Sequence, residues 1–348
     1  MEFRFDIDKW GGEGKHWERI RTVMRHEEPD CIPITMWRHF PEVEDDIERS
    51  ARVHLAFQMR FNLDLIVYTP PFAFTAWPWG YEMGEDRDGY GRPVEPERPF
   101  EEMELWPRLR EVGSETEIFA HYLKTLRLIR RNAQDMPVLA TVYGPLTTAY
   151  FLRGDSIRED VKIVGEDGDE KGALHNGLAD AYETIENSLS DFYREVLDIA
   201  DGLYYISYFG GHDVIEDEEL LRVARDYDLD PVHSLTEAEK LLGLHIHGEE
   251  ILYDETLDYP FDMYNWHDRW VKPSMRDARM KNDDLLMGGI NEGDTLHNET
   301  PVAVSLQVDD AVNQVNADGL IISAGGPIHL DTPEENIRAA IEALRGEE

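Results

Sequence analysis

The feature that most restricts the fold of this chain is a repeated pattern, in which a short β-rich apolar run precedes a longer amphipathic stretch. Strands that alternate with helices along one chain are typical of βα units and a parallel sheet. Apolar residues recur at helical spacing in stretches such as Glu117–Asn132, Ala179–Ala200 and Glu216–Tyr227. Eight segments have the strand pattern: Cys31–Met36, Leu63–Tyr68, Val138–Tyr143, Gly202–Tyr208, Leu242–His247, Phe261–Trp266, Leu285–Ile290 and Gly319–Ser323.

Eight βα units predict an α/β fold, a single (β/α)8 TIM barrel, and a length of 348 residues is within the range of such barrels. We expect one domain over residues 1–348, with residues 1–16 as an N-terminal extension. Asp331-Thr332-Pro333 predicts the start of the last helix, because proline suits the first turn and the next two residues are acidic. The acidic, glycine-rich segment Val164–Gly177 is expected to be an exposed loop.

The charge balance argues against one class of partner. The chain has 73 acidic and 34 basic residues, a formal net charge of −39. Nucleic acid needs a basic face on its protein partner, and no Lys/Arg cluster supplies one. Molar salt shortens the Debye length to about 3 Å and screens such self-repulsion, so we interpret the composition as adaptation to a salty cytoplasm. The alternative is a basic partner or a cationic substrate.

The remaining composition indicates a cytoplasmic enzyme without a dinucleotide or nucleotide motif. Cys31 is the only cysteine, so an internal disulfide is impossible and a reducing compartment is expected. The N-terminus has no signal-peptide pattern, and no apolar run approaches the roughly 18–20 residues of a membrane helix. G-x-G-x-x-G, Walker A, G-x-S-x-G and C-x-x-C patterns do not occur.

In a barrel of this type, function is expected where the strands end at their carboxyl termini. Trp37, Arg38 and His39 follow the first predicted strand. Arginine binds a carboxylate or phosphate through two parallel hydrogen bonds, so Arg38 is a candidate anion anchor. The alternative is a surface salt bridge to Glu42 or Glu44.

The sharpest local motif is His245-Ile246-His247 at the end of the fifth predicted strand. Residues two apart on a strand face the same side, so both imidazoles can converge on one ion. Imidazole suits zinc, copper, iron or nickel, and two histidines with one more ligand would form an open catalytic site. The alternative is that both rings only make hydrogen bonds in the barrel mouth.

A second polar cluster follows the sixth predicted strand and contains Asn265, Trp266, His267 and Asp268. His267 with Asp268 is a candidate acid or base with its orienting carboxylate, provided that the strand has ended by His267. His267 is also a candidate metal ligand. The alternative is a polar loop in which Trp266 fills the top of the barrel.

These segments resemble the uroporphyrinogen decarboxylase superfamily, which also contains zinc-dependent corrinoid methyltransferases. The resemblance runs from about Trp17 to Glu347 and implies a (β/α)8 barrel. It implies that Ser207 faces the substrate. The motifs that carry it are Glu28–Ile34, Phe61–Ile66, Tyr143–Thr147, Ala200–Gly211 and, most specifically, Gly319–Ile337.

The chain departs from the decarboxylases of this superfamily at the residues that hold their substrate. The resemblance implies two arginines on the first loop, but only Arg38 is present. The expected aspartate falls at Pro70 or Pro71, and an expected histidine is replaced by Gly326. An octa-acidic tetrapyrrole needs several cations, so this chain is a poor host for uroporphyrinogen.

The methyltransferase branch holds zinc with an H-x-C motif and a second cysteine in the closing glycine turn. Here the first motif is His245-Ile246-His247, and the second position is again Gly326. The resemblance therefore implies two of three ligands, unless His267 or His329 replaces the third. Three histidines would leave more positive charge on the ion and favour water or an oxygen acceptor as well as a thiol.

We therefore expect an enzyme of metal-assisted methyl, or one-carbon, transfer, with zinc as cofactor and a small-molecule substrate. The methyl donor would be a corrinoid on another protein or a small methylated compound, and a homodimer is expected from the family. Two alternatives stay open: metal-free decarboxylation of a carboxylated tetrapyrrole, with Arg38 anchoring the acid and His39 or His267 supplying the proton, or a non-catalytic barrel that binds a tetrapyrrole or corrinoid. The candidate residues are Arg38, His39, Ser207, His267 and Asp268 as catalytic, Trp37, Tyr143, Asn265, Trp266 and Gly326 as substrate-binding, and His245, His247 and His329 as metal-binding.

Overall fold

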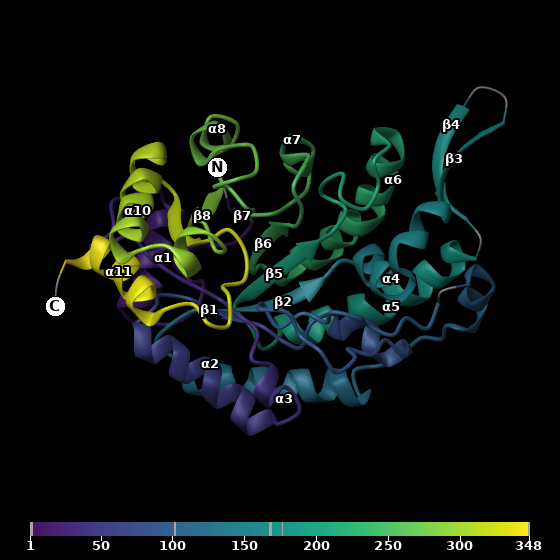
Figure 1. The fold of residues 1–348 in the computed structure, drawn as a ribbon, viewed down its shortest axis with the longest axis horizontal. Helices are drawn as coiled ribbons and strands as arrows, with labels where there is room; N and C mark the ends of the chain where they lie inside the picture. Colours follow the sequence, from purple (N-terminus) through teal and green to yellow (C-terminus); the bar gives the residue numbers. More distant parts are fainter. Residues whose placement is uncertain (1–2, 101, 167–168, 176, 347–348) are drawn as a thin grey trace.

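A curved sheet of seven parallel strands forms the centre of the molecule, and helices pack around its outside (Figure 1). The computed structural model describes residues 3–100, 102–166, 169–175 and 177–346. The fold is α/β, of the TIM-barrel type. The strand order is β1 (Ile66–Tyr68), β2 (Val138–Tyr143), β5 (Gly202–Ser207), β6 (Leu241–Ile246), β7 (Met263–Asn265), β8 (Leu285–Ile290) and β9 (Leu320–Ala324).

The strands are buried along their whole length, as expected for a parallel sheet covered on both faces. The predicted helix Glu117–Asn132 is found with the same bounds, and the last helix begins at Glu334, directly after Pro333. The helices are α1 (Lys15–Met24), α2 (Ile47–Phe61), α3 (Glu117–Asn132), α4 (Pro145–Arg153), α5 (Leu178–Leu197), α6 (Glu218–Leu229), α7 (Tyr253–Thr256), α8 (Met275–Arg279), α9 (Thr295–Asn298), α10 (Pro301–Val315) and α11 (Glu334–Arg345). Shorter 3-10 helices cover Pro41–Val43, Phe74–Trp79, Met103–Arg108, Gly154–Glu159 and Asp230–Ala238.

The first predicted strand, Cys31–Met36, is reduced to a single parallel bridge between Ile34 and Ile322 of β9. Pro33 has no N–H to donate, which shortens the ladder. The segment still links the two edges of the sheet, because Thr35 N donates to Ile322 O at 2.9 Å and Asp64 N donates to Ile34 O at 2.8 Å. These contacts place residues 34–35 between β9 and β1, the position of the missing eighth strand.

The prediction of an exposed loop over Val164–Gly177 is wrong for the described residues. β3 (Val161–Glu166) and β4 (Asp169–Leu174) form an antiparallel hairpin, which projects from the body of the molecule in Figure 1. The run Val161-Lys162-Ile163-Val164 is rich in β-branched residues, and these favour a strand. The charged residues and glycines that follow this run are typical of a loop, and for that reason the strand was not predicted.

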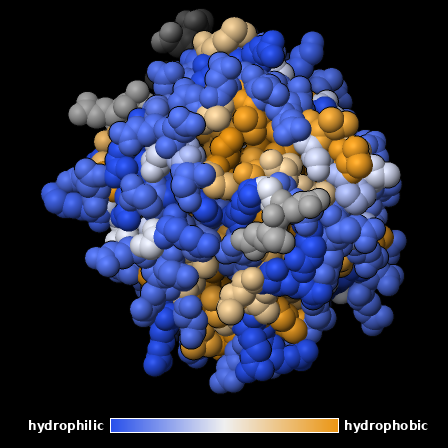
Figure 2. Space-filling view, turned by 90° about the vertical axis from the view of Figure 1, so that its left-hand side faces the viewer, coloured by the Kyte–Doolittle hydropathy of each residue, from blue (hydrophilic) through white to orange (hydrophobic). Residues whose placement is uncertain are grey.

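The surface on the α10–α11 side of the molecule is mostly hydrophilic, with apolar side chains in smaller patches (Figure 2). This distribution accords with the large excess of acidic residues in the chain. Among the described residues, none of the helices combines the length and the hydropathy needed to cross a membrane.

A candidate active site with three converging histidines

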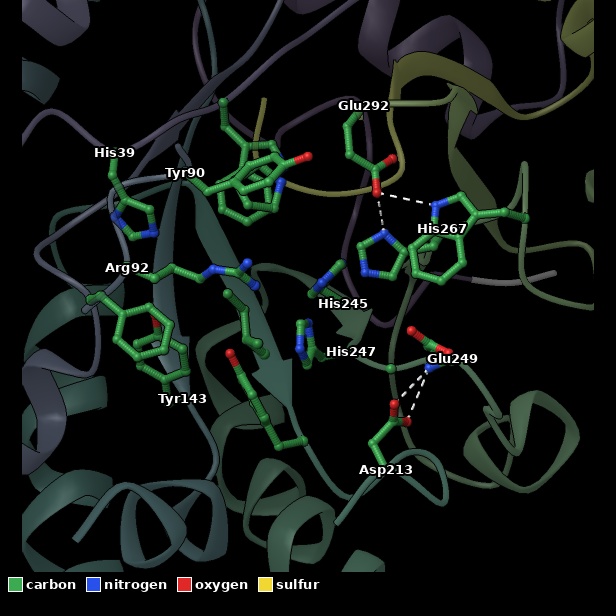
Figure 3. Close-up of a pocket in the computed structure, with 17 residues that line it drawn as sticks. His39, Tyr90, Arg92, Tyr143, Asp213, His245, His247, Glu249, His267 and Glu292 are labelled. Atoms are coloured by element: carbon green, nitrogen blue, oxygen red, sulfur yellow. Dashed lines mark hydrogen bonds and ion pairs between the residues drawn. The ribbon is translucent and has the colours of Figure 1, made fainter. Parts of the chain in front are cut away.

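A cavity of about 290 Å³ opens where the strands of the sheet end at their carboxyl termini (Figure 3). Most of its wall comes from segments that directly follow strands, as the barrel-mouth hypothesis predicted. Tyr90 and Arg92 come from the long segment between β1 and α3 instead. The lining residues are Trp37, His39, Phe72, Tyr90, Arg92, Tyr143, Ile206, Tyr208, Asp213, His245, His247, Gly248, Glu249, His267, Trp270, Glu292 and Pro327.

Three histidines converge in this cavity. His245 lies on β6, and His247 follows two residues later on the same side. His267 comes just after the neighbouring strand β7, two residues past Asn265, which pairs with His245 in the sheet. One ring nitrogen from each histidine lies within 4.8 Å of the other two. The ring centroids are 6.0, 5.5 and 5.8 Å apart, so the three rings form a nearly equilateral triangle.

Asn265 sets the orientation of His245. Its Oδ1 lies 2.6 Å from Nδ1 of His245 and accepts a further hydrogen bond from the Tyr204 hydroxyl at 2.6 Å. Its Nδ2 donates to Met287 O and Ala324 O. Because both amide hydrogens are used, Oδ1 must face the ring and His245 must donate from Nδ1. The lone pair on Nε2 of His245 is then left for the cavity.

Glu292, which follows β8, does the same for His267. Its Oε1 lies 2.6 Å from Nδ1 of His267 and also accepts a hydrogen bond from Trp270 Nε1 at 3.2 Å. Burial alone would raise the pKa of Glu292, but the contact with His267 outweighs it and the pKa is lowered. A carboxylate behind a histidine is the usual support of a metal-binding imidazole.

Asp268 was predicted to orient His267, and the structure corrects this. Asp268 points away from that ring, because successive residues in an extended chain face opposite sides. Its Oδ1 accepts a hydrogen bond from Gly289 N at 2.9 Å, and its Oδ2 lies 3.6 Å from Nε of Arg269. Burial raises the pKa of Asp268 to about 6.

Gly326 gives His267 its space. A Cβ added at Gly326 would lie 2.7 Å from Cε1 of His267, closer than real Cβ contacts allow. Gly326 is absent from the cavity wall, so its predicted role in substrate binding finds no support here. The resemblance implied a histidine or cysteine at position 326. Gly326 has no side chain, and the imidazole of His267 from the neighbouring loop fills the space.

His245 and His247 carry no charge at pH 7, because their surroundings lower the pKa of both rings. The pKa of His245 is lowered to about 3, mainly by burial and also by the neighbouring His267, while the bond to Asn265 opposes this. Burial, His267, His245 and Arg92 together hold the pKa of His247 well below its usual range. A histidine must be neutral to bind a metal ion, so both rings are in the required form.

Comparison with known proteins identifies the family to which this architecture belongs. The profile of the uroporphyrinogen decarboxylase family matches residues 15–346. The chain belongs to the uroporphyrinogen decarboxylase family. This confirms the resemblance deduced from the sequence motifs. A search of curated proteins finds no match.

Two solved structures share the fold at low sequence identity. A methyltransferase from Methanosarcina mazei is 15% identical, with a TM-score of 0.69 over 95% of this chain and 98% of the other. A B12-independent methionine synthase from Shewanella sp. W3-18-1, in complex with selenomethionine, is 13% identical, with a TM-score of 0.53 over 90% of this chain and 92% of the other. At such identities the likeness concerns the fold.

In this member of the uroporphyrinogen decarboxylase family, Ser207 does not face the cavity. It is fully buried, and its hydroxyl donates to Oδ2 of Asp228 at 2.6 Å. Thr147 donates to the same carboxylate from its backbone N and its hydroxyl, both at 2.7 Å. Ser207 was predicted as catalytic from the family resemblance, but it helps to satisfy a buried acid.

Two other predicted residues have structural roles. Trp266 is fully buried, and its Nε1 donates to Pro273 O at 2.9 Å, so it packs inside the barrel top and does not line the cavity. Asn265, predicted to bind substrate, is also fully buried and acts on His245. The structure therefore agrees with the alternative in which Trp266 fills the top of the barrel.

His329 lies apart from the three converging histidines. Its ring stacks on His297 at 3.8 Å, and its Nδ1 accepts a hydrogen bond from Asp331 N at 3.1 Å. Of the two candidates for a third ligand, the described structure brings His267 and not His329 to His245 and His247.

Trp37, His39 and Tyr143 lie on the cavity wall, where the sequence analysis expected them. The Trp37 ring is edge-on to His245 at 5.9 Å. His39 is buried, its Nδ1 lies 3.1 Å from Pro70 O, and burial lowers its pKa to about 4.

Arg38 was predicted to anchor an anion, but it does not line the cavity. Its Nη1 donates to Leu330 O at 2.8 Å, its Nε donates to His39 O at 3.2 Å, and the group packs over the Phe40 ring. The arginine on the cavity wall is Arg92. Sequence reasoning missed it, because it follows no strand and belongs to no motif.

Proposed function

We propose that this chain is an enzyme of metal-assisted methyl transfer, with His245, His247 and His267 as the ligands of a zinc ion. The observation that carries the proposal is the convergence of three ring nitrogens within 4.8 Å of one another, two of them on rings that Asn265 and Glu292 orient. Three imidazoles with an open fourth position are a donor set suited to catalytic zinc. The residues present therefore fit the metal that the family implies.

Zinc, when bound, would act as a Lewis acid that lowers the pKa of a thiol, water or hydroxyl acceptor beside it. The protein's own contribution is orientation and exclusion of water. Asn265 and Glu292 hold two of the imidazoles with their free nitrogens turned to one point. The rings of Trp37, Tyr208 and Trp270 pack against the three histidines and limit access of water to them.

The cavity supports a small substrate. Its volume of about 290 Å³ lies at the lower end of the range for small-molecule sites, roughly 300–1,000 Å³. An octa-acidic tetrapyrrole would need more space and several cations, whereas Arg92 is the arginine on the wall of the described cavity. A small methylated compound fits inside, and a corrinoid carried by a partner protein would have to present its methyl group at the mouth.

The methyltransferase from Methanosarcina mazei adds support, since its fold matches over almost the whole of both chains. The same arrangement of residues gives less support to metal-free decarboxylation of a tetrapyrrole, because a single arginine on the wall of the described cavity cannot pair with several carboxylates. The proposal therefore rests first on the histidines and second on the fold.

Metal analysis of protein purified without added zinc tests the proposal. We expect about one equivalent of zinc per chain, lost in His245→Ala and in His267→Ala. His329→Ala is the matched control and should keep the metal, because His329 lies apart from the cluster. Absence of stoichiometric metal in the unaltered protein would overturn the metal site. Transfer of the methyl group from methylcobalamin to a small thiol or alcohol then tests the reaction.

A further inference from the structure

The segment Asp88–Arg92 is a tight turn that carries one cation to the cavity wall. Oδ1 of Asp88 accepts hydrogen bonds from Tyr90 N and from Arg92 N, both at 2.9 Å. Oδ2 of Asp88 accepts from Nε of Arg92 at 2.8 Å. One aspartate therefore fixes both the backbone of the turn and the near edge of the Arg92 guanidinium.

This turn is also held from outside. Gly91 has a φ of +85°, and a Cβ added there would lie 2.9 Å from Cβ of His39. A Cβ at Gly89 would overlap the ring of His329, and Leu330 N donates to Gly89 O at 2.7 Å. Two glycines thus let the turn lie against the first loop and the last loop of the barrel. The position of Arg92 is set by packing as well as by Asp88.

The far edge of the Arg92 guanidinium is available for a ligand. No hydrogen bond from Nη1 or Nη2 is found among the described residues, and the side chain is 37% exposed. Figure 3 shows the group extending between His39 and Tyr143 toward the histidines. A planar guanidinium with its outer edge open matches the two oxygens of a carboxylate.

The opposite side of the cavity is acidic. Figure 3 shows Asp213, Glu249 and Glu292 across the histidines from Arg92. Two of these acids already have partners, since Asp213 accepts from Glu249 N at 2.9 Å and Glu292 contacts His267. An anionic group of a substrate would be attracted to the Arg92 side and repelled from the other, so the charges define one orientation.

The walls around Arg92 are aromatic. Phe72, Tyr90, Tyr143 and Tyr208 all line this part of the cavity, and the Arg92 guanidinium packs over the Tyr90 ring at 5.1 Å. Flat apolar walls next to a cation suit a ligand with a planar or compact apolar body and one charged end.

We propose that Arg92 is the specificity-determining residue of this site and that the substrate is a small carboxylate. Its carboxylate binds the open edge of Arg92, its body lies between the aromatic rings, and its reactive end lies at the three histidines. This inference rests on the proposed function for the role of the histidines. It does not require the metal for binding of the carboxylate.

Calorimetric titration of the full-length protein, as purified, with acetate and benzoate tests the inference, with acetamide and benzamide as neutral isosteres. We expect at least one acid to bind at least about tenfold more tightly than its amide, because hydrogen bonds between two charged groups are roughly twice as strong as those between neutral groups. Arg92→Gln should lower the affinity for that acid by at least about tenfold. Arg38→Gln is the matched control and should change it less than about twofold, because Arg38 lies off the cavity wall.

The same titration of His267→Ala separates this inference from the proposed function. If Arg92 binds the carboxylate, His267→Ala keeps the affinity for the acid even where the metal is lost. Loss of binding in His267→Ala, with binding retained in Arg92→Gln, would show that the acid binds the metal and would overturn the inference. Equal binding of acid and amide, or no binding of either acid, would overturn it too. Absence of metal in the unaltered protein would overturn the proposed function alone.

Discussion

The histidine side and the arginine side of the cavity are built in different ways. His245, His267 and Glu292 come from the ends of three neighbouring strands, β6, β7 and β8, whose register fixes their relative height. Arg92 comes from a long connection in which Glu82 and Glu97, then Arg87 and Pro93, make only isolated bridges. Strand register fixes the relative height of the histidines, whereas the place of Arg92 depends on the contacts of a single turn.

The supports of the two sides also differ in burial. Asn265 is fully buried behind His245, and the Glu292 side chain is only 6% exposed. The Asp88 side chain behind Arg92 is 32% exposed. Water competes for the contacts of Asp88 more than for those of Asn265 or Glu292. We therefore expect the histidine side to respond to altered supports more strongly than the arginine side.

The largest expected effect concerns Asp228, a buried acid of α6 that accepts a hydrogen bond from Ser207 at the end of β5. Burial raises its pKa to about 6, and the bonds from Ser207 and Thr147 oppose this only in part. The unfolded chain ionises near pH 3.9. The protonated acid therefore stabilises the fold fully below about pH 3.9, and this contribution, about 3 kcal/mol, is lost as the pH rises to about 6.

Urea unfolding of the unaltered protein and of Asp228→Asn, from pH 3.5 to 7 in about molar salt, measures this effect. The stability of the unaltered protein relative to Asp228→Asn should fall across that interval. A difference that stays constant with pH would mean that Asp228 ionises normally in the fold. Such a result would weaken the argument that burial strengthens the effect of altered contacts, on which the contrast between the histidine side and the arginine side depends.

Gly326→Ala should lower zinc affinity by about 100-fold, because the added Cβ displaces the His267 ring and its support by Glu292. Competition with a chromogenic chelator measures the affinity. Made in His267→Ala, the same substitution should leave the free energy of unfolding almost unchanged, since no ring is left to displace. A clear loss of stability in that background would show that Gly326 acts on the backbone instead.

Glu292→Gln should lower zinc affinity by about tenfold, because it removes the negative charge that orients and polarises His267. Glu249→Gln changes the charge by the same amount at an exposed rim position and serves as the control. If the two variants lose equal affinity, only the net charge of the cavity matters, and the buried contact contributes nothing specific.

The smallest effect is expected at the loop side. Asp88→Asn should weaken binding of the acid that Arg92 holds by about fivefold, because the guanidinium loses its charged partner at Nε. Charge alone predicts the opposite, since the variant removes a negative group near an anion. Asp86→Asn is the control, an exposed acid in the same segment. Titration calorimetry distinguishes the positioning effect from the effect of charge. Tighter binding in Asp88→Asn would contradict the positioning role of Asp88.

The parts of the site that could be predicted from the sequence are those that follow strand geometry. The spacing of His245 and His247 places both rings on one side of a strand, and His267 was expected where the next strand ends. The bounds of β2 and β8 and of α3 match the apolar patterns. Cys31–Met36 failed as a strand because Pro33 limits its pairing, an effect that the apolar pattern does not report.

The partners of the site residues were not predictable in the same way. Asp268 was chosen to orient His267 because it is adjacent in sequence, but adjacent residues diverge and Glu292 from another loop takes that place. Ser207 has a strand-end position and still turns to a buried acid. Arg92 depends on a turn built by Asp88 and two glycines, and such a turn gives no periodic signal.

The lack of a side chain at Gly326 also means that two loops at this end of the barrel compete for one volume. A Cβ at position 326 and the present His267 ring cannot occupy the same space, given the 2.7 Å approach. A ligand side chain placed at position 326 would therefore displace the His267 ring. The site takes its third ligand from the loop after β7 or from the loop after β9, and a ligand gained on one loop is a ligand lost on the other.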